Sequence, residues 1–83
     1  MTTTPYYVKV APRAARQMED LSLKQRKVIF KFIDGLAINP RPPGARKIEG
    51  MTGLYCESIN HLRLIYRIEE QEILLLLVLG RDR

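Results

Sequence analysis

The segment Leu62-Arg-Leu-Ile-Tyr66 decides the fold, because an arginine stands inside an apolar run. Neighbouring side chains of a strand point to opposite faces, so Arg63 points away from Leu62 and Leu64. An arginine next to a packed core is costly unless its guanidinium reaches water or an anion. We therefore expect a sheet with one apolar face and a second face that shows Arg63, which is a suitable place to hold a phosphate.

The sequence around this segment repeats with a period of two residues. Leu54–Ile59 and Leu62–Ile68 are expected strands, joined by a turn at Asn60-His61. After a second turn, Glu72–Leu79 is apolar throughout, which is typical of a central strand covered on both faces. Ala45–Glu49 is a possible short strand. Together these segments predict three or four strands in an antiparallel meander.

The N-terminal half predicts a strand followed by two helices. Tyr6–Val10 is rich in β-forming residues, and Pro12 suits the first turn of a helix that ends near Asp20. A capping box of Ser22 and Gln25 opens the second helix, which Asn39-Pro40 ends. The apolar stripe of that helix consists of Val28, Ile29, Phe32, Ile33 and Leu36. The fold class is therefore α+β, in the order N-terminal strand, αα-hairpin and antiparallel β-meander, with the helices on one face of a small sheet.

Composition limits the classes of function. The chain has 83 residues, which predicts one domain over 1–83. Fourteen lysines and arginines against nine acidic residues favour an anionic partner, namely nucleic acid, a ribosome or an acidic protein. One cysteine and one histidine cannot form a zinc site, so we expect no metal or other cofactor. No secretory signal or spanning segment is visible, and we expect a cytoplasmic protein with no membrane partner.

This order of elements resembles the RelE/ParE superfamily of toxins from bacterial type II toxin–antitoxin pairs. The matching motifs run through nearly the whole chain and are Asn39-Pro40, Lys47-Ile-Glu-Gly50, Leu54-Tyr55, Arg63-Leu-Ile-Tyr66 and Gly80-Arg81. The resemblance implies a RelE-like toxin domain. Members similar to RelE are mRNA interferases, endoribonucleases that cut the message on the ribosome and so inhibit translation. Members similar to ParE instead inhibit DNA gyrase, and an antitoxin neutralises both kinds.

Metal-free cleavage of RNA uses the 2′-OH as the nucleophile on its neighbouring phosphate, and it needs a base, cations for the phosphate oxygens and an acid. The resemblance places Arg63 at the scissile phosphate and Arg81 after the terminal glycine, with Arg83 in the next arginine position if one residue is inserted at Asp82. His61 and Glu57 are the candidates for proton transfer. Each candidate has an alternative. Arg63 could form an ion pair with Glu57, and His61 could be an ordinary surface histidine. Arg81 and Arg83 could be a plain basic tail.

Further basic residues are candidates for holding the RNA backbone. Arg46 and Lys47 lie near the expected sheet edge, and Lys24, Lys27 and Lys31 line one side of the second helix. Contacts of this kind with phosphates give affinity without sequence preference. The alternative in both cases is a solvated surface.

Two departures from the RelE pattern leave a second function open. RelE-like nucleases usually carry basic residues at the two alternate positions after the tyrosine that corresponds to Tyr55, where this chain has Cys56 and Ser58. The family also usually continues to a tyrosine, which is missing if Arg83 is the natural end. The alternative is a binding module on the same fold, either a ParE-like gyrase inhibitor or an inactive antitoxin-binding relic.

Either toxin function implies an antitoxin partner and a heteromeric complex. We expect an acidic antitoxin that wraps the toxin, covering an edge strand and the outer helical surface with an amphipathic helix or an added strand. A basic toxin and an acidic segment associate fast by electrostatic steering. The nuclease function adds the ribosome and mRNA as partners.

Overall fold

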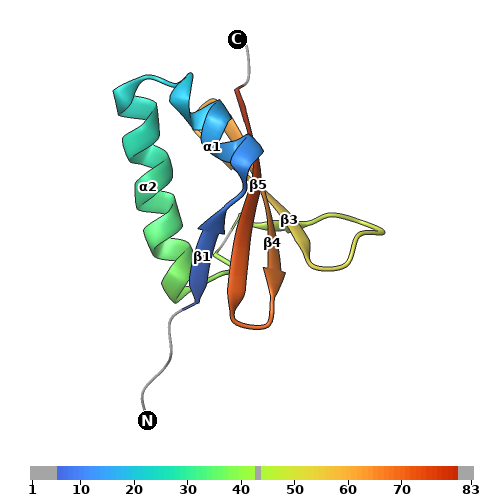
Figure 1. Cartoon of the computed structure of the whole chain (residues 1–83). Helices are drawn as coiled ribbons and strands as arrows, with labels where there is room; N and C mark the ends of the chain where they lie inside the picture. The colour runs from blue at the N-terminus through green and yellow to red at the C-terminus, as the bar shows by residue number, and fades with distance from the viewer. Residues whose placement is uncertain (1–5, 43, 81–83) are drawn as a thin grey trace.

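Over residues 6–42 and 44–80, which the computed structural model describes, two helices lie on one side of a five-stranded sheet (Figure 1). The elements are β1 (Tyr7–Val10), α1 (Pro12–Glu19), α2 (Leu23–Ile38), β2 (Arg46–Lys47), β3 (Leu54–Ile59), β4 (Leu62–Glu69) and β5 (Glu72–Gly80). The strand order across the sheet is β1-β5-β4-β3-β2. The expected α+β class is confirmed. The sheet is mixed, because β1 runs parallel to β5 whereas the other neighbours are antiparallel.

The capping box predicted for α2 is present. The Ser22 Oγ accepts a hydrogen bond from the Gln25 backbone N–H at 3.1 Å, and the Gln25 Oε1 accepts one from the Ser22 backbone N–H at 3.1 Å. These two bonds satisfy two of the amides that every helix leaves unpaired at its N-terminus. The start of α2 is therefore fixed by local sequence alone.

The core lies between the helices and the face of the sheet that they cover, called here the covered face. Its buried residues are Ala14, Met18, Ile29, Leu36, Leu62, Leu64, Tyr66, Ile68, Ile73, Leu75 and Val78. Tyr66 is completely buried, with its ring centroid 6.0 Å from those of Phe32 and Tyr55. The alternation predicted for β4 is confirmed, because every second residue from Leu62 to Ile68 belongs to this core.

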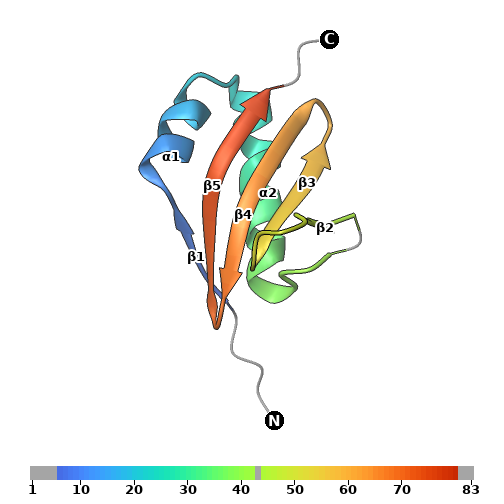
Figure 2. The ribbon, with the colours of Figure 1, turned by 90° about the vertical axis from the view of Figure 1, so that its right-hand side faces the viewer.

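The other face of the sheet, called here the open face, has no helix on it in the described part of the chain. Figure 2 looks onto this face, with α2 behind the sheet. The strand pairings place on it Tyr7, Lys9, Arg46, Leu54, Cys56, Ser58, Arg63, Ile65, Arg67, Glu69, Glu72, Leu74, Leu77 and Leu79. The expectation that the Glu72–Leu79 strand is covered on both faces is wrong. β5 is central, between β1 and β4, but both helices lie on one side of it, and Leu79 on the open face is 39% exposed.

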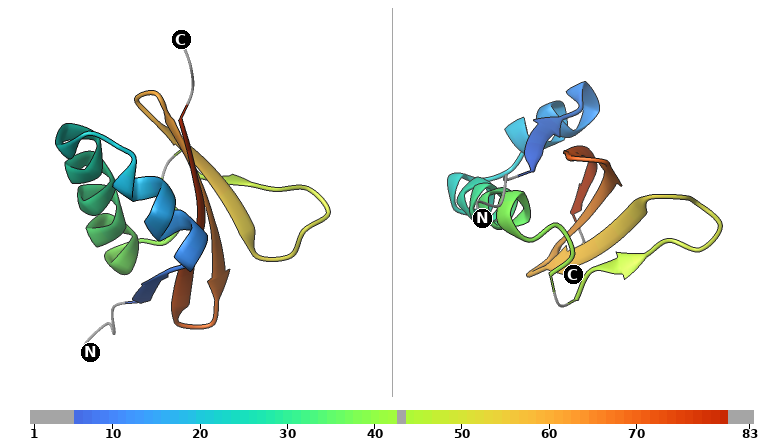
Figure 3. Two further views of the ribbon diagram at one scale, coloured as in Figure 1. Left: turned by 45° about the horizontal axis from the view of Figure 1, so that its top comes forward. Right: turned by 90° about the horizontal axis from the view of Figure 1, so that it is seen from below.

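The β2–β3 loop projects on the side away from the helices (Figures 1 and 3). The strand expected over Ala45–Glu49 is shorter, covering only Arg46–Lys47, because the chain turns at Gly50 and Gly53 with positive φ angles of 77°. At Gly53 an added Cβ would lie 3.0 Å from the carbonyl oxygen of Ile68, so the loop approaches β4 closely there. No helix within residues 6–42 and 44–80 is long and apolar enough to cross a membrane.

Candidate functional site

Arg63 lies on the open face near the start of β4, the middle strand of the sheet, in a row with Ser58 of β3 and Leu79 of β5. Its side chain is exposed and has no ion pair among the described residues. The alternative of an ion pair with Glu57 is excluded, because Glu57 pairs with Leu64 and therefore lies on the covered face. Within the described part of the chain, Arg63 is thus a cation without an ion pair on an uncovered sheet surface.

Two further arginines share this face. Arg67 follows Arg63 by four residues along β4, which separates their Cα atoms by about 13 Å. Arg46 of β2 pairs with Cys56, which in turn pairs with Ile65, so it joins the row between the two β4 arginines. Both are exposed and unpaired in the described ranges. Arg67 was missed from the sequence, although its even spacing from Arg63 is the signal that finds it.

The surface between these arginines is aliphatic. Cys56, Ile65 and Leu77 form one row across three strands, and each is half-buried. Cys56 and Ser58 both lie on the open face, so two cations of the RelE pattern are replaced by small side chains beside Arg63. Cys56 is a free thiol.

Glu57 occupies the opposite face from the arginines. Its Oε1 is buried and has no hydrogen-bond partner, and an added Cβ at Gly44 would lie 2.8 Å from its Oε2. Burial raises the pKa of this carboxyl above its ordinary value. The sheet therefore separates Glu57 from Arg63, and the structure does not bring these two catalytic candidates together.

The tyrosines near Glu57 have structural roles. The Arg41 Nε donates a hydrogen bond to the Tyr55 hydroxyl at 3.0 Å, and this bond raises the pKa of Arg41. The Tyr66 hydroxyl donates to the Pro40 carbonyl at 3.4 Å. Burial, with a smaller contribution from Glu57, raises the pKa of Tyr66 to about 12, so its phenol stays neutral at physiological pH.

His61 lies in the β3–β4 turn, directly after Asn60, whose φ is 55°. It is exposed and helps to line a recess of about 440 Å³ together with Lys24 and Val28 of α2. His61 is therefore grouped with the N-terminal end of α2.

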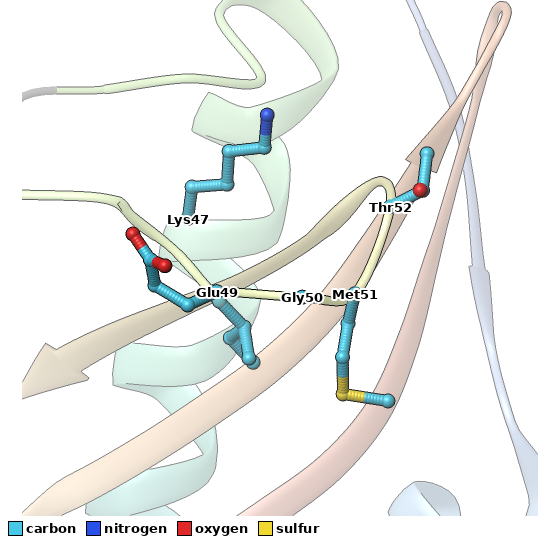
Figure 4. A pocket seen from close by; sticks show the side chains of 6 residues that line it. Lys47, Glu49, Gly50, Met51 and Thr52 are labelled. Carbon is cyan, nitrogen blue, oxygen red and sulfur yellow. The ribbon is translucent and has the colours of Figure 1, made fainter.

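The remaining basic candidates are spread over the surface. Lys24, Lys27 and Lys31 are exposed on α2, on the helical side of the sheet. Lys47 is exposed at the start of the β2–β3 loop, where it lines a recess of about 400 Å³ with Glu49 and Met51 (Figure 4). Arg81 and Arg83 lie outside the described residues.

The outer surface of the helical hairpin carries an apolar groove of about 260 Å³. Its walls are Val10, Ala15, Met18, Glu19, Arg26 and Phe30. Phe30 is 53% exposed, and the buried Nε of Arg26 has no hydrogen-bond partner. Neither this groove nor the open face gathers three or more metal-binding side chains within residues 6–42 and 44–80.

A family model of the ParE toxin of type II toxin–antitoxin systems, parDE, matches residues 8–83. The chain belongs to this toxin family. It is thus a toxin of the RelE/ParE superfamily, as the motifs around Arg63 and Gly80 had indicated. No curated protein is similar enough in sequence to count as a match.

Solved structures show that the toxin has the RelE fold. An archaeal RelE–RelB complex from Pyrococcus horikoshii matches with a TM-score of 0.84 and 25% identity, over 98% of this toxin and 99% of that chain. The RelBE2 toxin–antitoxin complex from Mycobacterium tuberculosis matches with a TM-score of 0.82 and 22% identity, over 99% and 98%. A chromosomal ParDE system from P. aeruginosa matches with a TM-score of 0.78 and 15% identity, over 96% and 100%. The fold is therefore common to toxins named RelE and toxins named ParE.

Proposed function

We propose that this toxin inhibits translation as a ribosome-dependent mRNA endoribonuclease that uses no metal ion. The observation that supports this function best is the position of Arg63, which is exposed on the open face and has no ion pair with any described residue, with Arg46 and Arg67 on either side of the same aliphatic surface. Guanidinium groups match phosphate oxygens with two parallel hydrogen bonds and stay charged at all relevant pH values. A face with three such groups fits an RNA strand.

In the proposed reaction, the 2′-oxygen of one nucleotide forms a bond to the adjacent phosphorus and loses its proton. The bond from phosphorus to the 5′-oxygen of the next nucleotide breaks, and that oxygen takes up a proton. The products are a cyclic 2′,3′-phosphate and a 5′-hydroxyl. Arg63 stabilises the extra charge on the phosphate oxygens in the transition state, a task for which preorganised donors are well suited.

The ribosome fits this reaction because, among the described residues, no obvious acid or base lies beside Arg63 on the open face: its carboxylates, Glu69 and Glu72, lie at the other end of β4 and β5. In the described ranges, Cys56 and Ser58 are the protic neutral side chains of that face close to Arg63, and Glu57 lies behind the sheet. Such a site depends on cations and on the alignment of the 2′-oxygen with the leaving oxygen. Alignment alone contributes large rate factors. A message that the ribosome already holds in one conformation is the substrate on which such a site works best.

An antitoxin is the second partner in this proposal. The RelE-like toxins of the Pyrococcus and Mycobacterium structures are bound to their antitoxins. The groove with Val10, Met18 and Phe30 on the helical hairpin has the apolar lining that an amphipathic antitoxin helix requires. Because the substrate is translated message, we place the toxin in the cytoplasm.

Primer extension on a translated message after brief induction tests the nuclease function. We expect new 5′ ends within the coding region for the wild type, and none for Arg63→Ala. Arg16→Ala is the matched control, since Arg16 is an exposed arginine on α1, and it should give the wild-type pattern. Growth arrest without new 5′ ends contradicts the nuclease function.

A non-nuclease function is the second candidate, and one observation favours it. The two positions beside Arg63 at which RelE-like nucleases carry cations are Cys56 and Ser58 on the open face, and the matching family model is that of ParE. In this case the toxin binds DNA gyrase or only its antitoxin. A supercoiling assay with purified gyrase separates the two functions: loss of supercoiling with intact message supports the ParE-like function, and normal supercoiling excludes it.

A further inference from the structure

The end of the open face away from Arg63, beside the β4–β5 turn, carries a shallow recess of about 140 Å³, called here the distal recess (Figure 2). Its walls come from three adjacent strands and are Lys9, Arg67, Glu69, Glu72 and Leu74. The pairings place Lys9, Leu74 and Arg67 in one row across the sheet, and Tyr7, Glu72 and Glu69 in the next row. Pockets that enclose whole drug-sized ligands start at about 300 Å³, so the distal recess fits one small group of a larger ligand.

The charges of the distal recess cancel, whereas the chain as a whole carries a net charge of +5. Two cations and two carboxylates line it. The Nζ of Lys9 lies 3.5 Å from the Oε2 of Glu72 in an exposed ion pair. Arg67 and Glu69 are exposed and form no ion pair with any described residue, although their Cα atoms are about 7 Å apart. The recess therefore offers the donors of Arg67 and the acceptors of Glu69 to a neutral group, while its carboxylates disfavour a phosphate.

Apolar surface lies beside these polar groups. Leu74 is half-buried in the recess, and Tyr7 in the neighbouring row is 63% exposed on β1. Proteins that bind single-stranded RNA stack its bases on aromatic rings and form hydrogen bonds with the edges of the bases. A nucleobase is a flat, neutral group with apolar faces and polar edges. It therefore matches both the apolar and the polar side chains at this end of the sheet.

We propose that the distal recess binds a guanine base of the message and so gives the toxin a sequence preference. The inference rests on the nuclease function proposed above. The guanidinium of Arg67 donates to O6 and N7 of guanine, and the carboxylate of Glu69 accepts from its N1–H and N2–H groups. Adenine, cytosine and uracil do not offer two adjacent acceptors and two adjacent donors to such a pair, so guanine is the preferred base.

The length of β4 determines how far this guanine lies from the cut. Arg63, which stabilises the scissile phosphate in the proposed reaction, is about 13 Å from Arg67. A stacked strand advances about 3.4 Å per nucleotide and an extended strand advances further, so the guanine lies about two to four nucleotides from the scissile bond. The recess thus recognises a base that does not flank the cut.

Titration of the purified toxin with the four nucleoside 5′-monophosphates tests the recess without any cleavage. NMR follows the side-chain Nε–H of Arg67 and the backbone amides of residues 67–74. We expect the guanine nucleotide to bind about tenfold more tightly than the other three, and Glu69→Gln to remove this difference. The matched control is Glu70→Gln, because Glu70 is an exposed carboxylate of the β4–β5 turn outside the recess, and it should keep the preference.

Mapping of the 5′ ends of messages after brief induction tests the position of the guanine. For the wild type we expect guanine to be enriched about two to four nucleotides from the cut. Arg67→Gln and Glu69→Gln should still cleave, because Arg63 is intact, but should lose this enrichment. Glu70→Gln should keep the wild-type pattern.

Two results overturn the inference. The first is equal binding of the four nucleotides, or a guanine preference that Glu69→Gln leaves unchanged. The second is cleavage with the same base preference in the wild type and in Glu69→Gln. A guanine preference that depends on Glu69, combined with no new 5′ ends for the wild type, instead refutes the nuclease function and supports the recess as a guanine site. The two failures are therefore distinguishable.

Discussion

The two faces of the sheet are built from the same strands, yet their side chains meet different surroundings. On the covered face, alternate residues of β4 pack against α2 and are buried without exception from Leu62 to Ile68. On the open face, the residues between them include Arg63 and Arg67, which are exposed and unpaired in the described ranges. We therefore propose that one strand contributes stability through one set of positions and function through the other. Substitutions on the two faces should therefore have separable effects.

Loss of the Tyr66 side chain from the covered face should have the largest effect on the stability of the fold. Tyr66 is completely buried between Phe32 and Tyr55, and Tyr66→Ala should lower the free energy of unfolding by about 3–5 kcal/mol. Urea denaturation followed by circular dichroism measures the change. The matched control is Tyr7→Ala, since Tyr7 is 63% exposed on β1, and its effect should be below about 1 kcal/mol. Equal losses in the two variants would contradict the distinction between the faces.

Substitution of Arg63 should change activity and leave stability intact. Arg63→Ala should lower the rate of message cleavage by about a hundredfold, which corresponds to about 2.7 kcal/mol of transition-state stabilisation. Arg63→Lys should lose less, because the charge remains while the two-pronged contact to phosphate is lost. Cleavage of ribosome-bound message by the purified variants gives the rates, and denaturation curves should coincide with the wild type. A destabilised Arg63→Ala protein would show that the open face also carries folding energy.

The covered face lies under α2, and the N-terminal cap of this helix provides a smaller, local test of stability. Ser22→Ala removes the acceptor for the Gln25 backbone N–H and should cost about 1 kcal/mol. Ser58→Ala is the matched control, because Ser58 is an exposed serine on the open face, and it should be nearly neutral. The midpoint of urea unfolding, measured for both variants and the wild type, gives the change in stability. A neutral Ser22→Ala would mean that packing of α2 on the sheet makes the cap redundant.

The covered face was predictable from the sequence, and the open face only in part. Alternation around Arg63 and the capping pattern of Ser22 and Gln25 are local signals, and both predicted the structure correctly. The parallel pairing of β1 with β5 joins residues far apart in the chain, and no local pattern encodes it. The register shift between Ile65 and Tyr66 against β5 is likewise a property of two strands together.

The site was harder to predict than the fold because side chains from several strands meet only in the folded sheet. The run Glu72–Leu79 looks like a strand buried on both sides, since a sequence does not say on which side the helices lie. Arg67 lies on the open face like Arg63, four residues further along β4. This spacing indicates a shared face only if the segment is known to be a strand. Glu57 was assigned a possible catalytic role, although its alternation with Tyr55 and Ile59 indicates the face toward the helices, where the structure places it. The burial of its carboxyl there depends on the path of the loop at Gly44, which no local pattern encodes.

Glu57 provides the last test, because its carboxyl lies on the covered face, where burial disfavours the charged form. Burial raises the pKa of Glu57 in the folded state above its ordinary value near 4.5, so the folded protein binds a proton more tightly than the unfolded chain does. A raised carboxyl pKa means that this group favours folding at low pH, and that its contribution is lost as the pH rises through the interval between the unfolded and folded pKa values. Glu57→Gln keeps the shape of the side chain and removes the titration. We expect the variant to lose the decline in unfolding free energy above pH 4.5 that the wild type shows, and to be the more stable protein at neutral pH. Denaturation curves at a series of pH values test this, and parallel pH profiles for the two proteins would mean that Glu57 finds water or a cation in solution.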